Sequence, residues 1–387
     1  MNKYLGALAL LFIGASIAWA ILGQTLVQRT IDSDTQQRTY LSGQWGSVQT
    51  QEAPRVTAYD SSAPVPMRSS RITVALRLEQ RRKGLLWYNL YDVQFLGRYI
   101  VRNTTNSDRL SLRVPLPASD ASYADFRCAV GGRQIDTETL LSRGIVVFAL
   151  EPGESTSIEL AYTSRGMESW LYRFKRSGVD SLSDFSLAMT TNFKDIDFPA
   201  NTLLPVTEEP SGNGWRLSWN YKTLVTSNAI GMVIPYPPQP GPLAERITFW
   251  APVALLFYFF VMLLITTLRG IKLHPINYFF LASAFFAFHL LFAYLVDRIP
   301  LTSAFIICSL VSMFLTISYL RLVVGLRFAA VESGLAQLIY LILFSYALFN
   351  EGWSGLTITI GAIITLFVAM QLTGRIRWGN YTDLVQT

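Results

Sequence analysis

The feature that most constrains this chain is the distribution of its apolar residues. One apolar run, Leu5–Leu22, stands near the amino end, a long polar stretch follows, and from Ile247 onward the sequence is almost continuously hydrophobic. A bilayer core about 30 Å thick requires about 20 apolar residues per helix. This layout therefore predicts a polar domain that is attached to a membrane at both of its ends.

The composition agrees with an integral membrane protein that has one sizeable polar part. Of the 387 residues, 51% are hydrophobic and only 15% are charged, which lies outside the usual range of soluble domains. The net charge of +6 is modest and no long basic run occurs, so membrane lipid is an expected partner and nucleic acid is not. Cys128 and Cys308 fall in the polar and the hydrophobic parts, which excludes a disulfide framework.

We expect six membrane-spanning helices. Their predicted bounds are Leu5–Leu22, Ile247–Leu268, Ile276–Val296, Leu301–Leu320, Ala330–Phe349 and Leu356–Leu372. Six spans place both termini on one side, and positively charged short loops remain in the cytoplasm. The basic residues that fall on the side of the termini are Lys3, Arg269, Lys272, Arg321, Arg327, Arg375 and Arg377. Both termini are therefore expected in the cytoplasm of a bacterial inner membrane, with the polar domain in the periplasm.

The first span has two interpretations. Lys3, the apolar core and Ala18-Trp19-Ala20 also fit a cleavable secretory signal. We favour an uncleaved anchor, because hydrophobicity continues through Ile21-Leu22. Cleavage would leave five spans and an external amino terminus.

The predicted domain layout follows from these spans. It comprises an anchor over 1–23, a periplasmic linker over 24–70, a periplasmic β domain over 71–234, a proline-rich spacer over 235–246, a five-helix bundle over 247–373 and a cytoplasmic tail over 374–387. The spacer is expected to be extended, because proline fixes φ and biases the preceding residue away from helix.

The polar domain carries the pattern of β-strands. Apolar residues alternate with polar ones in runs such as Leu110–Leu116 and Ile158–Tyr162, and the runs end at turn sequences such as Glu151-Pro152-Gly153-Glu154. Closely spaced strands without amphipathic helices indicate an antiparallel β-sandwich, inserted between the first and second spans. One large sandwich and two small lobes, divided near 165–180, both remain open.

No catalytic constellation is predicted, and no cofactor or metal. The two histidines, His274 and His289, lie beside or within the hydrophobic segments, which leaves the polar domain without histidine-based catalysis or zinc ligation. Asp195 and Asp197 are spaced to face one side of a strand, as glycosidase carboxylates or calcium ligands can be. Solvated carboxylates explain them more simply, so we expect no enzyme.

The most distinctive polar stretch is a basic cluster beside aromatic residues. Arg81, Arg82 and Lys83 precede Trp87 and Tyr88, and such a cluster could contact anionic headgroups, a polysaccharide or a protein partner. The alternative is a strand that ends in a solvated hairpin tip. A second aromatic series forms either a groove or a core: Trp170, Tyr172, Phe174, Trp215 and Trp219.

Polar residues inside the predicted spans form the other candidate site. His289, Glu332 and Gln337 could line a proton or ion route. The alternative is that they hydrogen-bond between helices. Four small residues recur every fourth position in the fourth span, which predicts a helix-packing face: Ala304, Cys308, Ser312 and Thr316.

Several short motifs resemble those of the inner-membrane CreD family of bacterial envelope proteins, which is associated with colicin tolerance. They are Leu273-His274-Pro275 with Tyr278, Ser318-Tyr319-Leu320, Gln371–Trp378, Thr191-Asn192-Phe193 with Phe198, Leu204-Pro205, Gly214–Trp219 and Gln44-Trp45-Gly46. The resemblance implies an inner-membrane protein that contributes to envelope integrity and stress tolerance. It implies no catalytic reaction and supplies no active-site residues.

The leading hypothesis is therefore a non-enzymatic envelope protein whose periplasmic β domain binds a protein or glycan partner. The alternative is a transporter or channel component that uses His289, Glu332 and Gln337. No oligomeric state is predicted.

Overall fold

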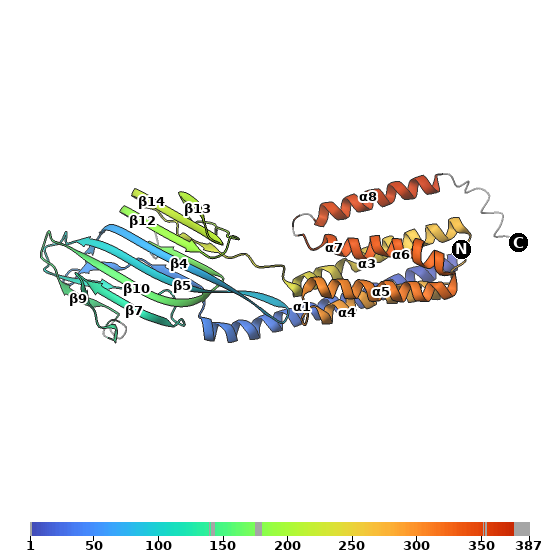
Figure 1. Cartoon of the computed structure of the whole chain (residues 1–387), viewed down its shortest axis with the longest axis horizontal. Helices are drawn as coiled ribbons and strands as arrows, with labels where there is room; N and C mark the ends of the chain where they lie inside the picture. Colours follow the sequence, from blue (N-terminus) through green and yellow to red (C-terminus); the bar gives the residue numbers. More distant parts are fainter. Residues whose placement is uncertain are drawn as a thin grey trace. The chain divides into compact units, whose positions relative to one another are not determined.

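The computed structural model describes residues 2–138, 140, 144–174, 180–350, 352 and 354–374. The chain divides into two compact units (Figure 1). The helical unit comprises Met1–Asp34, Gly84–Leu86 and Pro238–Thr387, and the β unit comprises Thr35–Lys83 and Trp87–Pro237. The expected combination of a helical membrane part with an inserted β domain is thus present. The predicted tail, with Arg375 and Arg377, lies outside the described residues apart from Gly374.

The helical unit contains long apolar helices (Figure 1). They are α1 (Asn2–Trp45), α3 (Pro240–Arg269), α4 (Pro275–Leu295), α5 (Leu301–Val323), the consecutive segments η1 (Phe328–Ser333), α6 (Gly334–Gln337), η2 (Leu338–Leu343) and α7 (Phe344–Ala347), and α8 (Ser354–Thr373). Among the described residues five helices are long and apolar enough to cross a membrane, and Gly355–Gln371 is a shorter apolar helix.

Helix α1 differs from the prediction, because it continues to Trp45 instead of ending near Leu22. The predicted linker is consequently helical up to that residue. The stretch after the apolar run is polar but contains no proline, so nothing in it interrupts a helix. Helix α1 ends at Gly46, whose φ of +78° favours glycine and whose N–H donates to the Ser42 carbonyl at 2.8 Å.

The proline-rich spacer is also shorter than predicted. Helix α3 begins at Pro240, so the second half of the predicted spacer forms its first turns. Proline is tolerated there because the first N–H groups of a helix have no intrahelical partner. Only the residues before Pro240 are extended.

The core of the helical unit is dense in aromatic rings. Tyr258 on α3 and Phe285 on α4 lie 4.7 Å apart between ring centroids, and both are completely buried. The predicted packing face of α5 is confirmed, because Ala304, Cys308, Ser312 and Thr316 are all buried. Their small side chains let α5 approach its neighbours closely.

The β unit is built from three sheets (Figure 1). Its strands are β1 (Gln49–Glu52), β2 (Arg55–Ala58), β3 (Pro64–Val65), β4 (Met67–Lys83), β5 (Leu86–Arg102), β6 (Arg109–Arg113), β7 (Tyr123–Val130), β8 (Arg133–Gln134), β9 (Val146–Ala149), β10 (Ser155–Met167), β11 (Ser169–Arg173), β12 (Asp180–Thr191), β13 (Thr207–Ser211), β14 (Gly214–Thr226) and β15 (Ile230–Val233). The strand orders are β1-β11-β15, β13-β14-β12-β4-β5-β10-β7-β8 and β3-β2-β6-β9.

Two of the three sheets are mixed, whereas the prediction was antiparallel throughout. Strand β1 pairs with β11 in parallel, and β12 pairs with β4 in parallel. Parallel neighbours require a long connection between the strands, and both pairs are far apart in sequence. Alternation within a strand reports which face is buried but not which strand lies beside it, so the sequence pattern missed these pairings.

One apolar core joins all three sheets of the β unit. Alternate residues of β5 enter it, among them Val93, Phe95 and Tyr99. The aromatic series is core and not a groove: Trp170, Tyr172, Phe174 and Trp219 are buried, and Trp215 is half-buried against the same cluster.

Candidate functional site

The predicted basic and aromatic contact lies at the hairpin between β4 and β5. Arg81 is exposed, Arg82, Lys83 and Trp87 are half-buried, and Tyr88 is buried at 1% exposure. Tyr88 is therefore a core residue and is not available to a partner.

The alternative interpretation, a solvated hairpin tip, fits the turn residue Gly84, which is exposed, but not the turn residue Leu85. Leu85 is buried at 3% exposure in the apolar core of the helical unit. Its carbonyl accepts a hydrogen bond from the Gly241 N–H at 2.8 Å, in the first turn of α3. The tip is thus a packed element of the helical unit.

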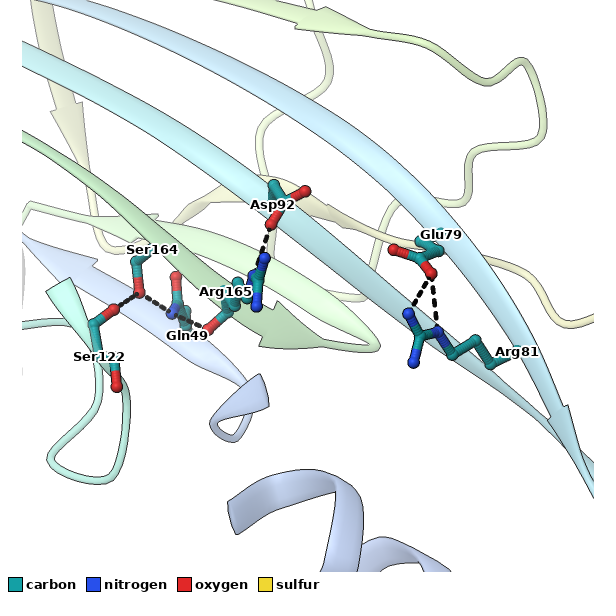
Figure 2. Close-up of polar contacts among 7 residues, drawn as sticks. All are labelled: Gln49, Glu79, Arg81, Asp92, Ser122, Ser164 and Arg165. Carbon is teal, nitrogen blue, oxygen red and sulfur yellow. Dashed lines mark hydrogen bonds and ion pairs between the residues drawn. The ribbon is translucent and has the colours of Figure 1, made fainter. Parts of the chain in front are cut away.

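Arg81 belongs to a cluster centred on Trp45. The guanidinium carbons of Arg81 and Arg165 lie over the Trp45 ring, 5.1 and 4.8 Å from its centroid. Each arginine also has a carboxylate partner, Glu79 for Arg81 at 2.5 Å and Asp92 for Arg165 at 3.0 Å (Figure 2). Arginine stacks well on aromatic faces, and its N–H groups remain free to bind carboxylates at the ring edge.

A buried amide lies next to this cluster. Gln49 Nε2 donates to the Ser164 hydroxyl at 2.8 Å and to the Arg165 carbonyl at 2.7 Å (Figure 2). Ser164 in turn donates to the Ser122 carbonyl at 2.9 Å. These contacts fix the backbone from which the Arg165 side chain extends, so the cluster is rigid at its base.

The electrostatics of the Trp45 cluster favour a structural role. Each guanidinium is matched by one carboxylate, and Trp45 is only 5% exposed, so no open aromatic face remains for a sugar ring. An anionic ligand would have to compete with Glu79 and Asp92. The sequence pattern did not predict that Trp45 and Arg165 lie beside Arg81, because the three residues are far apart in the chain and meet only in the folded protein.

His289 on α4 is buried in the helical unit at 1% exposure. Its Nδ1 lies 3.0 Å from the Phe285 carbonyl, and its ring lies edge-on to Trp19 of α1 at 5.5 Å. Neither His289 Nε2 nor Trp19 Nε1 has a hydrogen-bond partner among the described residues. Trp19, absent from the predicted site, is the aromatic neighbour of this histidine.

Gln337 is completely buried and links two helices. Its Nε2 donates to the Ser312 hydroxyl at 2.8 Å, and Ser312 donates to the Ala284 carbonyl at 2.6 Å. Gln337 lies between the π-helical segments η1 and η2, an arrangement that is frequent at functional sites. Its Oε1 has no partner in the described part of the chain.

Glu332 has a different environment from the other two intramembrane candidates. Its carboxylate forms an ion pair with Arg269, the last residue of α3, whose side chain is 59% exposed. Within the ranges that the structure describes, no hydrogen bond joins Glu332, His289 and Gln337 to one another. The structure therefore does not bring the three together as one polar route.

Asp195 and Asp197 show no paired-carboxylate geometry. Both are exposed, and Asp197 accepts the N–H of Phe198 at 2.9 Å while its backbone forms a bridge to Val233. Throughout the described residues no group of three or more His, Cys, Asp or Glu side chains could hold a metal ion. The two carboxylates thus behave as solvated loop residues.

These features define a membrane protein class: a bundle of membrane-length helices with a large β domain inserted after the first helix. The sequence model of the family described as "Inner membrane protein CreD" matches residues 226–379. The match confirms the resemblance to the CreD family over these residues. Together with the membrane-length helices, the match supports an inner-membrane protein.

Two further comparisons add little. No curated protein matches the chain. One solved structure that it resembles is a proposed nutrient binding protein from Legionella pneumophila, at 10% identity and a TM-score of 0.28, covering 55% of this chain and 76% of that one. A similarity at that level supports no conclusion about fold or function.

Proposed function

We propose that the protein is a non-enzymatic component of the bacterial envelope, whose β domain faces the periplasm and binds a protein or glycan partner. The observation that carries this proposal is the β unit itself. It has its own extensive apolar core, and the chain enters and leaves it through segments continuous with membrane-length helices. A domain of this size between two spans is best explained as a binding module held at the membrane.

The proposed orientation has both termini in the cytoplasm. It is supported by two ion pairs that the described residues of the helical unit form near opposite ends of the spans. Arg269 and Glu332 pair at the end that carries Lys272, whereas Arg29 and Asp297 pair at the other end. The end rich in basic residues is the cytoplasmic one by the positive-inside rule.

Reporter fusions test this orientation. Alkaline phosphatase, which is active only after export, is fused after Gly153, an exposed turn residue, and after Gly270, which ends α3. We expect activity from the first fusion and none from the second. Activity from the Gly270 fusion alone would reverse the orientation and end the proposal.

An uncleaved α1 is part of the proposal. Trp19 is completely buried, and Leu22 and Leu26 belong to the same apolar core. Cleavage after Ala20 would remove Trp19 and expose the apolar core residues that pack against its ring. Intact mass measurement on the purified protein should give the mass of the full chain, 43.4 kDa, and a product beginning at Ile21 would contradict this part.

The second candidate function is a transporter or channel component. It is favoured by the unpartnered buried atoms, His289 Nε2 and Gln337 Oε1, and by the π-helical segments that flank Gln337. Substitution of His289 by Phe distinguishes the two candidate functions. A transporter should lose function, whereas an anchoring bundle should retain the envelope phenotype at normal abundance.

A further inference from the structure

A hollow in the β unit collects arginine side chains from three strands. It has a volume of about 660 Å³, and Arg55 of β2, Arg113 of β6 and Arg173 of β11 line it. Cavities of this size are typical of ligand sites, which span about 300–1,000 Å³. The hollow lies apart from the Trp45 cluster, none of whose residues line it.

The strand register places two of these arginines face to face. Arg55 is the direct antiparallel partner of Arg113, and directly opposed like charges destabilise a sheet. Glu52 offsets the charge of Arg55, whereas the charge of Arg113 has no ion-pair partner among the described residues. An anion beside the opposed pair would relieve the remaining repulsion, so the pair favours an anionic ligand.

The hollow also lacks enough negative charge of its own. Among the described residues that line the hollow, Glu52 is the one carboxylate, and it accepts a hydrogen bond from Arg55 Nη2 at 2.9 Å. Arg173 is the register partner of Glu52 in the β1–β11 pair, yet no ion pair to Arg173 or Arg113 occurs among the described residues. This contrasts with Arg81 and Arg165, each of which has a carboxylate partner.

The apolar residues that line the hollow indicate what kind of molecule carries the negative charge of the ligand. Val114 and Leu140, both nearly buried, and the half-buried Phe126 line it. A free oxyanion would gain nothing from this apolar surface. A ligand that carries carboxylates on an apolar body would use both, because arginine forks bind carboxylates bidentately while the floor takes the apolar part.

We infer that the hollow lined by Arg55, Arg113 and Arg173 binds an acidic peptide segment through its carboxylates. This inference rests on the proposed function, since it names the chemistry of the partner that the β domain takes. It also moves the partner site away from the predicted stretch Arg81–Lys83.

The test uses the full-length protein in nanodiscs of zwitterionic lipid and the fluorescence anisotropy of a labelled peptide of alternating glutamate and leucine. The wild type should bind this peptide and not the matching lysine–leucine peptide. Arg113→Gln and Arg173→Gln should each weaken binding by about tenfold or more. Arg109→Gln, an exposed arginine on the same strand that does not line the hollow, should leave affinity unchanged.

A second readout guards against a loss of binding through misfolding. Because Arg113→Gln removes the opposed charge, the thermal midpoint of the ligand-free variant should rise, and that of Arg109→Gln should not. Inorganic phosphate at equal ionic strength should fail to displace the peptide.

Three results would overturn the inference: equal peptide affinity in Arg113→Gln and Arg109→Gln, equal binding of the lysine peptide, or displacement by phosphate. The last would mean that the arginines take a free oxyanion. None of these results would alter the activity of the alkaline phosphatase fusions after Gly153 and Gly270. A failure of the peptide-binding inference can therefore be distinguished from a failure of the proposed orientation.

Discussion

Arg29 Nη2 on α1 lies 3.1 Å from Asp297 Oδ2, in the turn between α4 and α5. The same guanidinium donates to the Ala293 carbonyl at 3.0 Å through Nη1 and lies 4.8 Å from the centroid of the Tyr294 ring. Both charged side chains are mostly buried, with 29% and 23% of their surfaces exposed. These contacts attach α1 to the rest of the helical unit.

The Arg29–Asp297 pair should contribute measurably to stability. Asp297→Asn leaves a partly buried guanidinium without its carboxylate, which we expect to cost about 1–2 kcal/mol. Arg29→Gln should cost at least as much, because it also removes the contacts to Ala293 and Tyr294. The thermal midpoint of the purified protein measures both losses.

Arg298→Gln is the matched control for this pair. Arg298 is the next residue and is exposed, so its replacement should leave the midpoint within error of the wild type. In a double-mutant cycle, Asp297→Asn should cost much less in the Arg29→Gln background. Strictly additive losses would show that the two side chains do not interact.

Gly46 should tolerate no side chain. At its φ of +78°, an added Cβ would lie 3.0 Å from both the Arg165 carbonyl oxygen and the Ala121 Cβ. We expect Gly46→Ala to destabilise the β unit by about 1–2 kcal/mol from the backbone alone, and by more from these close contacts. Tryptophan fluorescence during thermal unfolding would report the loss.

Gly43 offers the internal comparison for Gly46. It lies inside α1 with nothing within 4 Å of an added Cβ. Gly43→Ala should therefore be neutral or stabilise by about 0.5–1 kcal/mol. Similar destabilisation at both positions would refute the interpretation of Gly46 as the stop of α1.

Cys128 should be a poorly reactive thiol. Burial raises its pKa to about 11, so at pH 8 the folded protein contains roughly two hundredfold less thiolate than an exposed cysteine would. In a Cys308→Ser variant, where Cys128 is the remaining cysteine, iodoacetamide should label it very slowly until denaturant is added. Rapid labelling of the folded protein at pH 8 would contradict the buried position.

The same pKa shift makes stability depend on pH. The folded pKa lies above the ordinary value of about 8.5, so loss of the proton favours the unfolded chain. The contribution of Cys128 is complete below pH 8.5 and declines as the pH rises toward 11. Cys128→Ala should remove this part of the alkaline loss of stability.

Local sequence signals predicted much of the fold. Hydrophobic length located the spans that became α3, α4 and α5, and alternation located strands such as β5, β6 and β10. The predicted turn Glu151–Glu154 is present, with Gly153 at a φ of +87°. Each of these features depends on residues that are close together in the chain.

Features that depend on distant residues were not predictable in this way. The polar half of α1 carries no apolar periodicity, and its one signal, Gly46 after the last turn, is weak without the structure. The Trp45 cluster joins residues from three separate segments. The opposition of Arg55 and Arg113 requires the register of β2 on β6, which alternation alone does not provide.

The proposed function depends on the β domain and the α3–α4 turn lying on opposite sides of the membrane. Single cysteines placed at Glu151 and Lys272, both exposed, in a variant with Cys128→Ala and Cys308→Ala, test it with a membrane-impermeant maleimide. In cells with a permeabilised outer membrane we predict labelling of Glu151→Cys, and labelling of Lys272→Cys only after lysis. Labelling of Lys272→Cys before lysis, with Glu151→Cys protected, would contradict the account.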